Sequence, residues 1–512
     1  MNIQKFTWSL LLTFLTFTAF AQKQATKKGY NIRVKIEGYT NDTLILGYRL
    51  GSKTYVKDTC FGKDKDSKGY FVFKKDTLLE GGVYLILTKP TNTYFEFLIP
   101  NDNEQNLTLT TKPEGADMTK NLKVEGSPDN QAFLDYIHYL GDMFKKRQPI
   151  EQQFSAETDP EKKKALEEEL NKLNKDVEAF QKNMFEKYAS YLSVRLIKAS
   201  QQPTIPKEIE VKGQPHTYYY FKNHYFDGYD WSDKRLVRTP VLEQKIEFYT
   251  DKLTPQDPDS VIVSCDYILD QVIKGGSKEV FQFVAAHLLN KYAQSKVICM
   301  DKVYVHLGTK YYCGAEKPEW IDSTQLEKIC ENVKDLRYAQ CGQHAPQINL
   351  TNIKNGLPIS LYGIKARFVV VYFWDPTCGN CTKNSKKLVP IYEKWKGENF
   401  EIYGICSKSI EEKEECEKKI KEVGMNWINS NDKSYPLAVV KKMYDVKVNP
   451  FIYLLDQEKK IMYKRLDPEQ VDEILTREIE RLDKENPELK IMERELQKRE
   501  KQGWKEKVEE GN

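Results

Sequence analysis

A strongly apolar stretch that leads into a Cys-x-x-Cys motif is the feature that most constrains the fold of this chain. Every residue of Phe368–Trp374 is apolar or aromatic, which is typical of a strand covered on both faces of its sheet. Cys378 and Cys381 follow after a short turn, and the segment from Cys378 to about Lys396 has a helical pattern. The sequence therefore predicts a buried strand whose following helix begins at the first cysteine.

Strand and helix signals continue to alternate on the C-terminal side of this motif. The further expected elements are a strand at Phe400–Cys406, a charged helix at Glu411–Val423, a hairpin of Phe451–Leu455 with Lys460–Tyr463, and a helix that opens at Pro468. This order is a βαβ unit followed by a ββα unit. It predicts an α/β domain over residues 339–480.

The position of the Cys-x-x-Cys motif at a helix start has a chemical meaning. Free N–H groups at a helix N-terminus favour an anion, so Cys378 is expected to react as a thiolate and to act as the nucleophile. The two intervening residues place Cys381 one turn further on, where it can attack a mixed disulfide and release the partner. Cys378 and Cys381 are therefore the candidate catalytic residues.

A second signal is Pro450, which directly precedes the apolar strand at Phe451–Leu455. Proline cannot lie within a central strand, so it marks the point where this strand begins. A cis Asn449–Pro450 bond would turn the chain and expose the Asn449 backbone to a bound peptide. Pro450 and Asn449, together with Trp374 and Thr377, are the candidate residues of a substrate groove.

The rest of the chain divides into segments in which apolar residues recur with different spacings. The 512 residues are too many for one hydrophobic core, and about three domains are expected. Short apolar runs separated by Gly, Asn and Asp predict a small antiparallel β-domain over residues 22–118. A helical period predicts an α-helical middle domain over residues 119–338. Residues 481–512 form a charged tail, expected to be a solvated helix or partly disordered.

Two features of the middle domain allow more than one interpretation. Apolar residues with heptad-like spacing between Leu166 and Met184 could form a homo-oligomer seam through the 160–192 helix, or could pack that helix on its own domain. The aromatic residues of Tyr218–Trp231 could form an exposed ligand groove or could pack between helices. Packing within the domain is the favoured interpretation of both.

The N-terminus has the order of features that defines a secretory signal peptide. Lys5 provides a positive charge, Phe6–Phe20 is a largely apolar run, and Ala19-Phe20-Ala21 presents small residues at the cleavage positions. The run is too short to cross a bilayer comfortably, which takes roughly 20 residues. Residues 1–21 are therefore expected to be removed after Ala21, and the mature chain to be periplasmic.

Composition excludes some functions. The 79 basic and 75 acidic residues nearly balance, so no nucleic-acid partner is expected. The histidines are scattered without the i, i+4 spacing of a helical metal pair, so neither a metal site nor a cofactor is expected. Most of the eight cysteines outside the motif are expected to be ordinary buried thiols, and sequence cannot assign their pairing.

The segment Tyr372–Cys381, together with Pro450, resembles the extracytoplasmic thioredoxin-like proteins of the TlpA/ResA type. Asn223–Asp227 and Met300–Leu307 resemble the helical domain of multidomain members from Bacteroidetes, in which a β-rich and a helical domain of unknown function precede the thioredoxin domain. The resemblance implies a thioredoxin fold over residues 339–480 and a periplasmic location. It also implies disulfide exchange with protein thiols and disulfides, as a reductase kept reduced by a membrane thiol-transfer protein.

The sequence departs from this resemblance next to the motif. Tyr372 stands where thioredoxins carry a buried Asp that helps proton transfer from the resolving thiol. Thr377 replaces the Trp before the first cysteine, and Asn380 replaces the Pro inside the motif. Asp375 is the candidate proton acceptor.

Two other functions are weighed against disulfide exchange. A peroxidase of the peroxiredoxin class would need Thr three residues and Pro seven residues before its reactive cysteine, and the chain has Asp375 and Val371 there. A non-enzymatic exported binding protein could keep a thioredoxin fold as a scaffold. Titratable thiols at Cys378 and Cys381 would separate an enzyme from such a scaffold.

Overall fold

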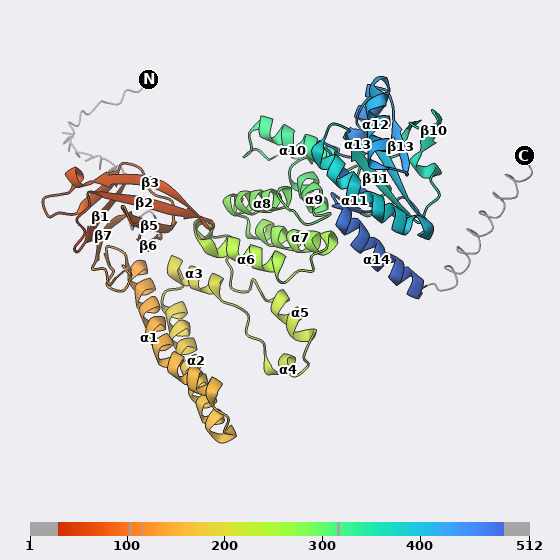
Figure 1. Ribbon diagram of the computed structural model, residues 1–512. Coiled ribbons are helices and arrows are strands. Elements are labelled where there is room, and N and C mark those ends of the chain that lie inside the picture. The colour runs from red at the N-terminus through yellow and green to blue at the C-terminus, as the bar shows by residue number, and fades with distance from the viewer. Residues whose placement is uncertain (1–28, 102, 104, 116, 315–317, 486–512) are drawn as a thin grey trace, which may run out of the picture. The chain divides into compact units, whose positions relative to one another are not determined.

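The computed structural model describes residues 29–485 except 102, 104, 116 and 315–317 (Figure 1). The predicted signal peptide and the part of the charged tail beyond residue 485 lie outside the described residues. The chain divides into two compact units, residues 1–244 and 245–512. No helix of the described ranges is long and apolar enough to cross a membrane.

The first unit begins with two four-stranded sheets that enclose one hydrophobic core. The sheet orders are β4-β1-β7-β8 and β3-β2-β5-β6. The strands are β1 Tyr30–Ile36, β2 Thr43–Leu50, β3 Lys53–Phe61, β4 Phe71–Lys75, β5 Gly82–Thr88, β6 Tyr94–Ile99, β7 Asn106–Thr111 and β8 Lys123–Glu125. The predicted small β-domain is confirmed. One pairing, β1 with β7, is parallel, because a long connection can return a strand in the same direction.

Helices follow the β-domain within the first unit. They are α1 Pro128–Ala156, α2 Pro160–Lys187, α3 Leu192–Ser200, α4 Lys207–Glu210 and α5 His216–Asn223. Helices α1 and α2 form a hairpin in which the ring of Phe180 stacks on Tyr139 at 3.9 Å between centroids. The heptad-like stripe thus faces α1 of the same chain. Tyr225, Phe226 and Tyr229 are buried, so this part of the aromatic segment packs inside the unit.

The second unit contains a helical part and a sheet. Helix α6 Pro240–Asp251 crosses the boundary between the units, and α7 Pro258–Gly275, α8 Lys278–Ala293, α9 Asp301–Tyr311 and α10 Ser323–Leu336 follow it. The sequence sets the helix ends locally. Asp257, Ser277 and Asp322 accept hydrogen bonds from backbone N–H groups at the starts of α7, α8 and α10. Gly276 ends α7 in the left-handed conformation.

The sheet of the second unit has seven strands in the order β10-β9-β13-β12-β11-β14-β15. The strands are β9 Asn349–Asn352, β10 Pro358–Ser360, β11 Phe368–Trp374, β12 Phe400–Cys406, β13 Ile428–Asn431, β14 Phe451–Leu455 and β15 Ile461–Lys464. Strand β11 is parallel to β12 and antiparallel to β14. Strands β11, β12, β14 and β15 belong to the βαβ and ββα units that the sequence predicts, whereas β9, β10 and β13 were not predicted. The domain has a thioredoxin-like fold.

Helices cover both faces of this sheet, which explains why β11 is apolar throughout. They are α11 Gly379–Trp395, α12 Lys413–Val423, α13 Ser434–Met443 and α14 Pro468–Glu485. Tyr372 and Trp374 share a core with residues of α11, α12 and α14. Val371 and Phe373 point to the opposite face, where α13 packs. All seven side chains of β11 are buried.

Six of the cysteines form disulfides: Cys299–Cys341, Cys313–Cys330 and Cys406–Cys416. The expectation that most cysteines outside the motif are ordinary thiols is therefore wrong. Only Cys60 and Cys265, both buried, are free thiols outside the motif. The paired residues lie on different elements that meet only in the folded chain, which is why spacing alone gives no pairing.

Candidate active site

Cys378 lies between the end of β11 and the start of α11, where it caps the helix. Its backbone is extended, with φ −81° and ψ 117°, and its Sγ accepts a hydrogen bond from the N–H of Cys381 at 3.1 Å. The N–H groups in the first turn of a helix have no partner within the helix, and a sulfur at this position accepts a hydrogen bond from one of them. Cys378 is partly exposed, so a partner disulfide can reach it.

Cys381 lies below Cys378 and is only 1% exposed. Burial raises the pKa of the Cys381 thiol above its ordinary value of 9.0, and the neighbouring Cys378 sulfur adds to this rise. One cysteine of the pair is therefore accessible, and the other is buried and held in its protonated form. This asymmetry is what a nucleophile and a resolving thiol require.

The chain around Pro450 approaches the motif from the other side. The Asn449–Pro450 peptide bond is cis, and the Asn449 carbonyl oxygen lies 3.8 Å from Cys378 Sγ, which donates to it. The Asn449 side chain donates to Ser407 Oγ at 2.7 Å, and the N–H of Ser407 donates to the Trp374 carbonyl at 2.8 Å. The ends of β11 and β12 thus hold this loop beside Cys378.

The two remaining candidate groove residues, Thr377 and Trp374, differ in their exposure to solvent. Thr377 is exposed beside Cys378, whereas Trp374 is 1% exposed. The expectation that Trp374 lines a substrate groove is therefore wrong. It is on the face of β11 that points into the core under α11, together with Tyr372, because side chains alternate along a strand.

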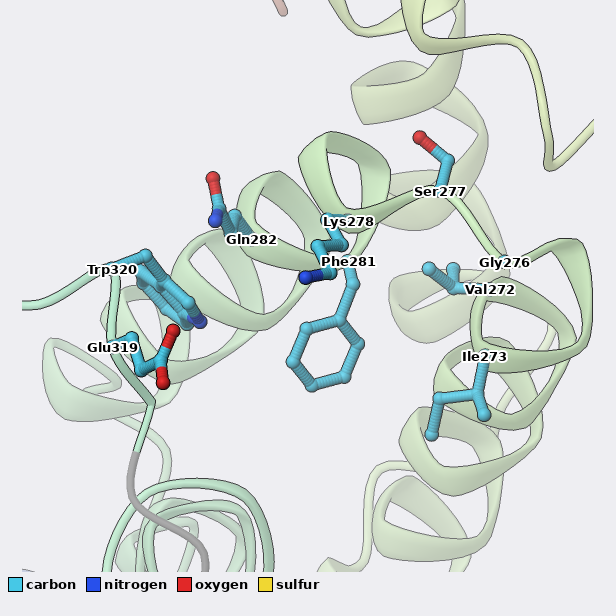
Figure 2. A pocket seen from close by; sticks show the side chains of 9 residues that line it. All are labelled: Val272, Ile273, Gly276, Ser277, Lys278, Phe281, Gln282, Glu319 and Trp320. Carbon is cyan, nitrogen blue, oxygen red and sulfur yellow. The ribbon is translucent and has the colours of Figure 1, made fainter.

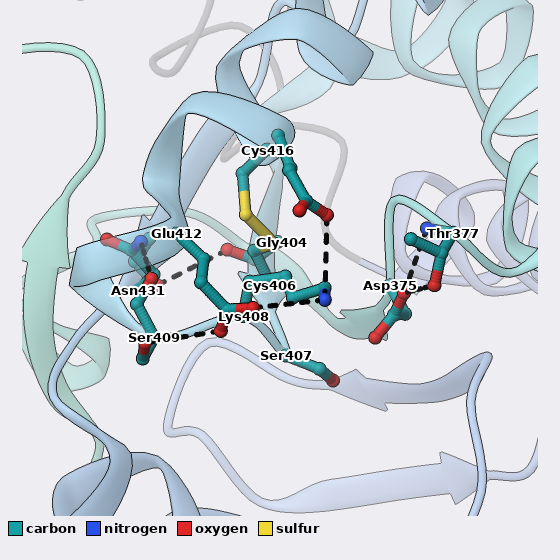
Figure 3. Close-up of a disulfide and its surroundings, with 12 residues drawn as sticks. Asp375, Thr377, Gly404, Cys406, Ser407, Lys408, Ser409, Glu412, Cys416 and Asn431 are labelled. Carbon is teal, nitrogen blue, oxygen red and sulfur yellow. Dashed lines mark hydrogen bonds and ion pairs between the residues drawn. A yellow bond between two sulfur atoms is a disulfide. The ribbon is translucent and has the colours of Figure 1, made fainter.

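Asp375 closes the turn between β11 and Cys378. Its Oδ1 accepts hydrogen bonds from the Thr377 N–H at 2.9 Å and from Thr377 Oγ1 at 2.6 Å, as Figure 3 shows. Its backbone carbonyl accepts from the Cys378 N–H at 3.2 Å. The carboxylate is close enough to help raise the pKa of Cys381. The hydrogen bonds of Asp375 therefore stabilise the turn that carries Cys378.

Tyr372 lies behind Cys381 in the core. It is 0% exposed, and its hydroxyl donates to the Cys381 carbonyl at 3.0 Å and lies 3.0 Å from Ser385 Oγ. Burial raises the pKa of this phenol, so it stays neutral. Sequence reasoning identified Tyr372 only as a departure and missed Ser385. The shared helix face of Cys381 and Ser385, four residues apart, was the available signal.

The Cys406–Cys416 disulfide lies one strand away from the motif. Cys406 is the last residue of β12 and is directly opposite Trp374 in the sheet, and Cys416 is on α12 (Figure 3). Both sulfurs belong to residues that are fully buried. The disulfide therefore fixes α12 to the strand beside the active-site strand.

A cavity of about 900 Å³ lies in the helical part of the second unit, away from the motif. Figure 2 shows Val272 and Ile273 of α7, Phe281 of α8 and Trp320 around it. None of the predicted site residues lines it. No cluster of three or more metal-ligating side chains occurs in the described ranges.

Comparison with known families agrees with this architecture. Residues 341–464 match the AhpC/TSA family. Residues 30–133 match DUF4369, and residues 153–339 match DUF5106, both of which are domains of unknown function. The predicted order, a β-rich and a helical domain of unknown function before a thioredoxin-like domain, is confirmed.

Individual relatives match part of the chain. The chain is 27% identical over 135 residues to the thiol-disulfide oxidoreductase ResA of Bacillus cereus, covering 25% of this chain and 72% of that protein. A thioredoxin-like protein from Bacteroides caccae aligns with a TM-score of 0.42 at 21% identity, over 54% of this chain and 97% of its own. The thioredoxin domain of a thiol-disulfide oxidoreductase from Bacteroides vulgatus aligns at 28% identity with a TM-score of 0.26, over 27% of this chain and 96% of its own. The predicted resemblance to ResA-type proteins is confirmed.

Proposed function

We propose that this chain is a periplasmic thiol–disulfide oxidoreductase that exchanges disulfides through Cys378 and Cys381. The observation that supports this best is the asymmetry of the pair. Cys378 is accessible at the N-terminus of α11 and accepts the Cys381 N–H at 3.1 Å, while Cys381 is buried beneath it. The match of the C-terminal domain to thiol-disulfide oxidoreductases gives independent support.

The reaction follows from this arrangement. The Cys378 thiolate attacks one sulfur of a partner disulfide, a bond forms between the two sulfurs, and the other partner sulfur leaves with the electron pair. Cys381 then loses its proton and attacks Cys378 Sγ, which releases the second partner sulfur as a thiolate. The products are a Cys378–Cys381 disulfide and a reduced partner, which takes up the protons.

The groove for the partner lies between the motif and the cis-proline loop. The Asn449 carbonyl faces Cys378, and Val448 beside it is 71% exposed. An extended peptide that lies over Thr377, Asn449 and Pro450 would bring its sulfur to Cys378 from the open side. Asp375 is the proposed proton acceptor for Cys381, because its carboxylate is close enough to Cys381 for its charge to help raise the pKa of that thiol.

The direction of exchange is proposed to be reduction. A reductase needs a source of electrons outside the cytoplasm, and a membrane thiol-transfer protein is the proposed donor. The signal-peptide features of residues 1–21 support a location outside the cytoplasm, and the relatives are named thiol-disulfide oxidoreductases, a class that includes reductases. A measured reduction potential of the Cys378–Cys381 pair below that of its partner disulfides is the expected result.

The proposal is tested by disulfide exchange with a small aromatic disulfide. The Cys378→Ala variant should lose this activity, whereas Cys265→Ala, which removes a free thiol buried in the helical part, should keep it. Full activity of Cys378→Ala would overturn the proposal. If the unmodified protein showed reactive thiols but no exchange, the chain would be a binding protein on a thioredoxin-like scaffold.

A further inference from the structure

A row of residues crosses the three central strands directly behind the active-site helix. Tyr372 of β11 is opposite Gly404 of β12, and Gly404 is opposite Asn429 of β13. Gly404 has no side chain, although the core around it is built from large residues such as Trp374 and Trp427. The space over Gly404, here called the Gly404 niche, is therefore bounded by side chains of its neighbours.

Three buried polar atoms converge on the Gly404 niche. A methyl group at Gly404 would lie 2.6 Å from Asn429 Oδ1, 3.0 Å from Trp427 Nε1 and 3.3 Å from Trp374 Nε1. These three atoms have no hydrogen-bond partner among the residues that the structure describes. Trp374 is 1%, Trp427 5% and Asn429 6% exposed, so bulk water does not satisfy them. Leaving such atoms unpaired in a core is costly.

The orientation of the Asn429 amide is fixed by its other contacts. Its Nδ2 donates to the carbonyls of Met425 at 3.2 Å and Trp427 at 3.1 Å. A flipped amide would direct its oxygen at those two carbonyl oxygens. Asn429 Oδ1 therefore faces the niche as an acceptor, and the two indole N–H groups face it as donors.

Two donors and one acceptor define the ligand that fits. An anion would be repelled by Asn429 Oδ1, and a metal ion would be repelled by the indole N–H groups. Water can accept two hydrogen bonds and donate others, and buried waters typically make about three. We propose that the Gly404 niche is a binding site for one buried water molecule, which accepts from Trp374 Nε1 and Trp427 Nε1 and donates to Asn429 Oδ1.

The water site has a consequence for the active site. Trp374 is the last residue of β11 before the turn that carries Cys378, and it shares a core with Cys381. A water that is hydrogen-bonded to the Trp374 indole thus holds this ring in place in the core against which Cys381 packs. This consequence rests on the proposed function, whereas the water site itself does not.

A crystal structure of the full chain in which ordered waters are visible tests the site directly. The expected result is one density peak within hydrogen-bond distance of all three polar atoms. In solution, both indole N–H signals should show a nuclear Overhauser effect to a long-lived water. A direct hydrogen bond from Trp427 Nε1 to Asn429 Oδ1, with no density in the niche, would overturn the proposal whether or not the protein exchanges disulfides.

Filling the niche gives a second test. Gly404→Ala adds a methyl group 2.6 Å from Asn429 Oδ1 and 3.0 Å from Trp427 Nε1, which leaves no room for a water on these two atoms, so the water peak should vanish. Gly397→Ala is the matched control, because its added methyl would meet nothing within 4 Å. A water peak that persists in Gly404→Ala, or that disappears in Gly397→Ala as well, would contradict the proposal. If Gly404→Ala does not fold, the water peak of the unmodified protein decides.

Discussion

The neutral hydroxyl of Tyr372 donates a hydrogen bond to the carbonyl of Cys381, in the place where thioredoxins carry a buried Asp. Tyr372→Phe keeps the ring and removes the hydrogen bonds to the Cys381 carbonyl and Ser385. Each hydrogen bond contributes about 0.5–1.5 kcal/mol net, so the loss of both should lower the unfolding free energy measured in urea by about 1–3 kcal/mol.

Tyr372→Phe should affect the two proposed chemical steps, attack by Cys378 and release of the partner by Cys381, to different extents. Alkylation of Cys378 should keep its rate, because Cys378 does not contact Tyr372 through either hydrogen bond. Release of the partner from Cys378 should slow. Ser385→Ala is the control that removes only the second hydroxyl. Equal effects on both steps would mean that Tyr372 acts only on the stability of the fold.

The raised pKa of Cys381 predicts a pH dependence with a definite sign. Burial favours the neutral thiol in the folded state, so this group stabilises the reduced protein below pH 9.0 and the contribution is lost as pH rises through the folded pKa. The reduced protein should therefore lose unfolding free energy above pH 9.0 to a greater extent than Cys381→Ser. Denaturant unfolding of both proteins at a series of pH values checks this, and parallel curves would contradict it.

The Cys406–Cys416 disulfide acts between two elements, β12 and α12. Replacing both cysteines by Ala should destabilise the protein by roughly 2–4 kcal/mol, the usual contribution of a native disulfide. The alkylation rate of Cys378 should not change, because the strand order and the cap of α11 do not depend on this bond. If the double variant were folded but could not exchange disulfides, this second disulfide would take part in the chemistry.

Within the second unit, the helical part is fixed to the edge of the sheet. Lys464 of β15 forms a buried ion pair with Asp301 of α9, and it also donates to the Ala339 carbonyl at 2.7 Å. The Cys299–Cys341 disulfide joins the same two parts. Gly342 and Gln343 hydrogen-bond to Ile461 of β15, and Ala345 donates to the carbonyl of Lys459 just before it, so this segment covers the edge of the sheet.

This attachment gives a prediction at the scale of the whole molecule. Asp301→Ala leaves the buried Lys464 ammonium without its partner and should cost about 3–5 kcal/mol of unfolding free energy. Replacing Lys464 by Met in the same protein should recover part of that loss, because the uncompensated charge is gone. A thermal unfolding series of the three proteins measures this. No recovery in the double variant would show that the ion pair is not what stabilises the junction.

The sequence predicts most of the second unit's sheet because its signals are local. The apolar run of β11 reveals a strand covered on both faces, and the Cys-x-x-Cys spacing marks the helix start. Contacts between distant elements were not predictable. The three disulfides and the parallel pairing of β1 with β7 depend on which elements meet after folding. Trp374 was misplaced because its position near Cys378 in sequence concealed its inward direction on the strand.

The central claim is that Cys378 attacks a partner disulfide and Cys381 releases it. Trapping of mixed disulfides by Cys381→Ser measures this most directly, because attack remains while release is lost. When this variant is mixed with periplasmic extract and separated by non-reducing electrophoresis, it should form covalent adducts that disappear with reductant, and Cys378→Ala should form none. Absence of adducts in Cys381→Ser, or equal adducts in both variants, would contradict the account.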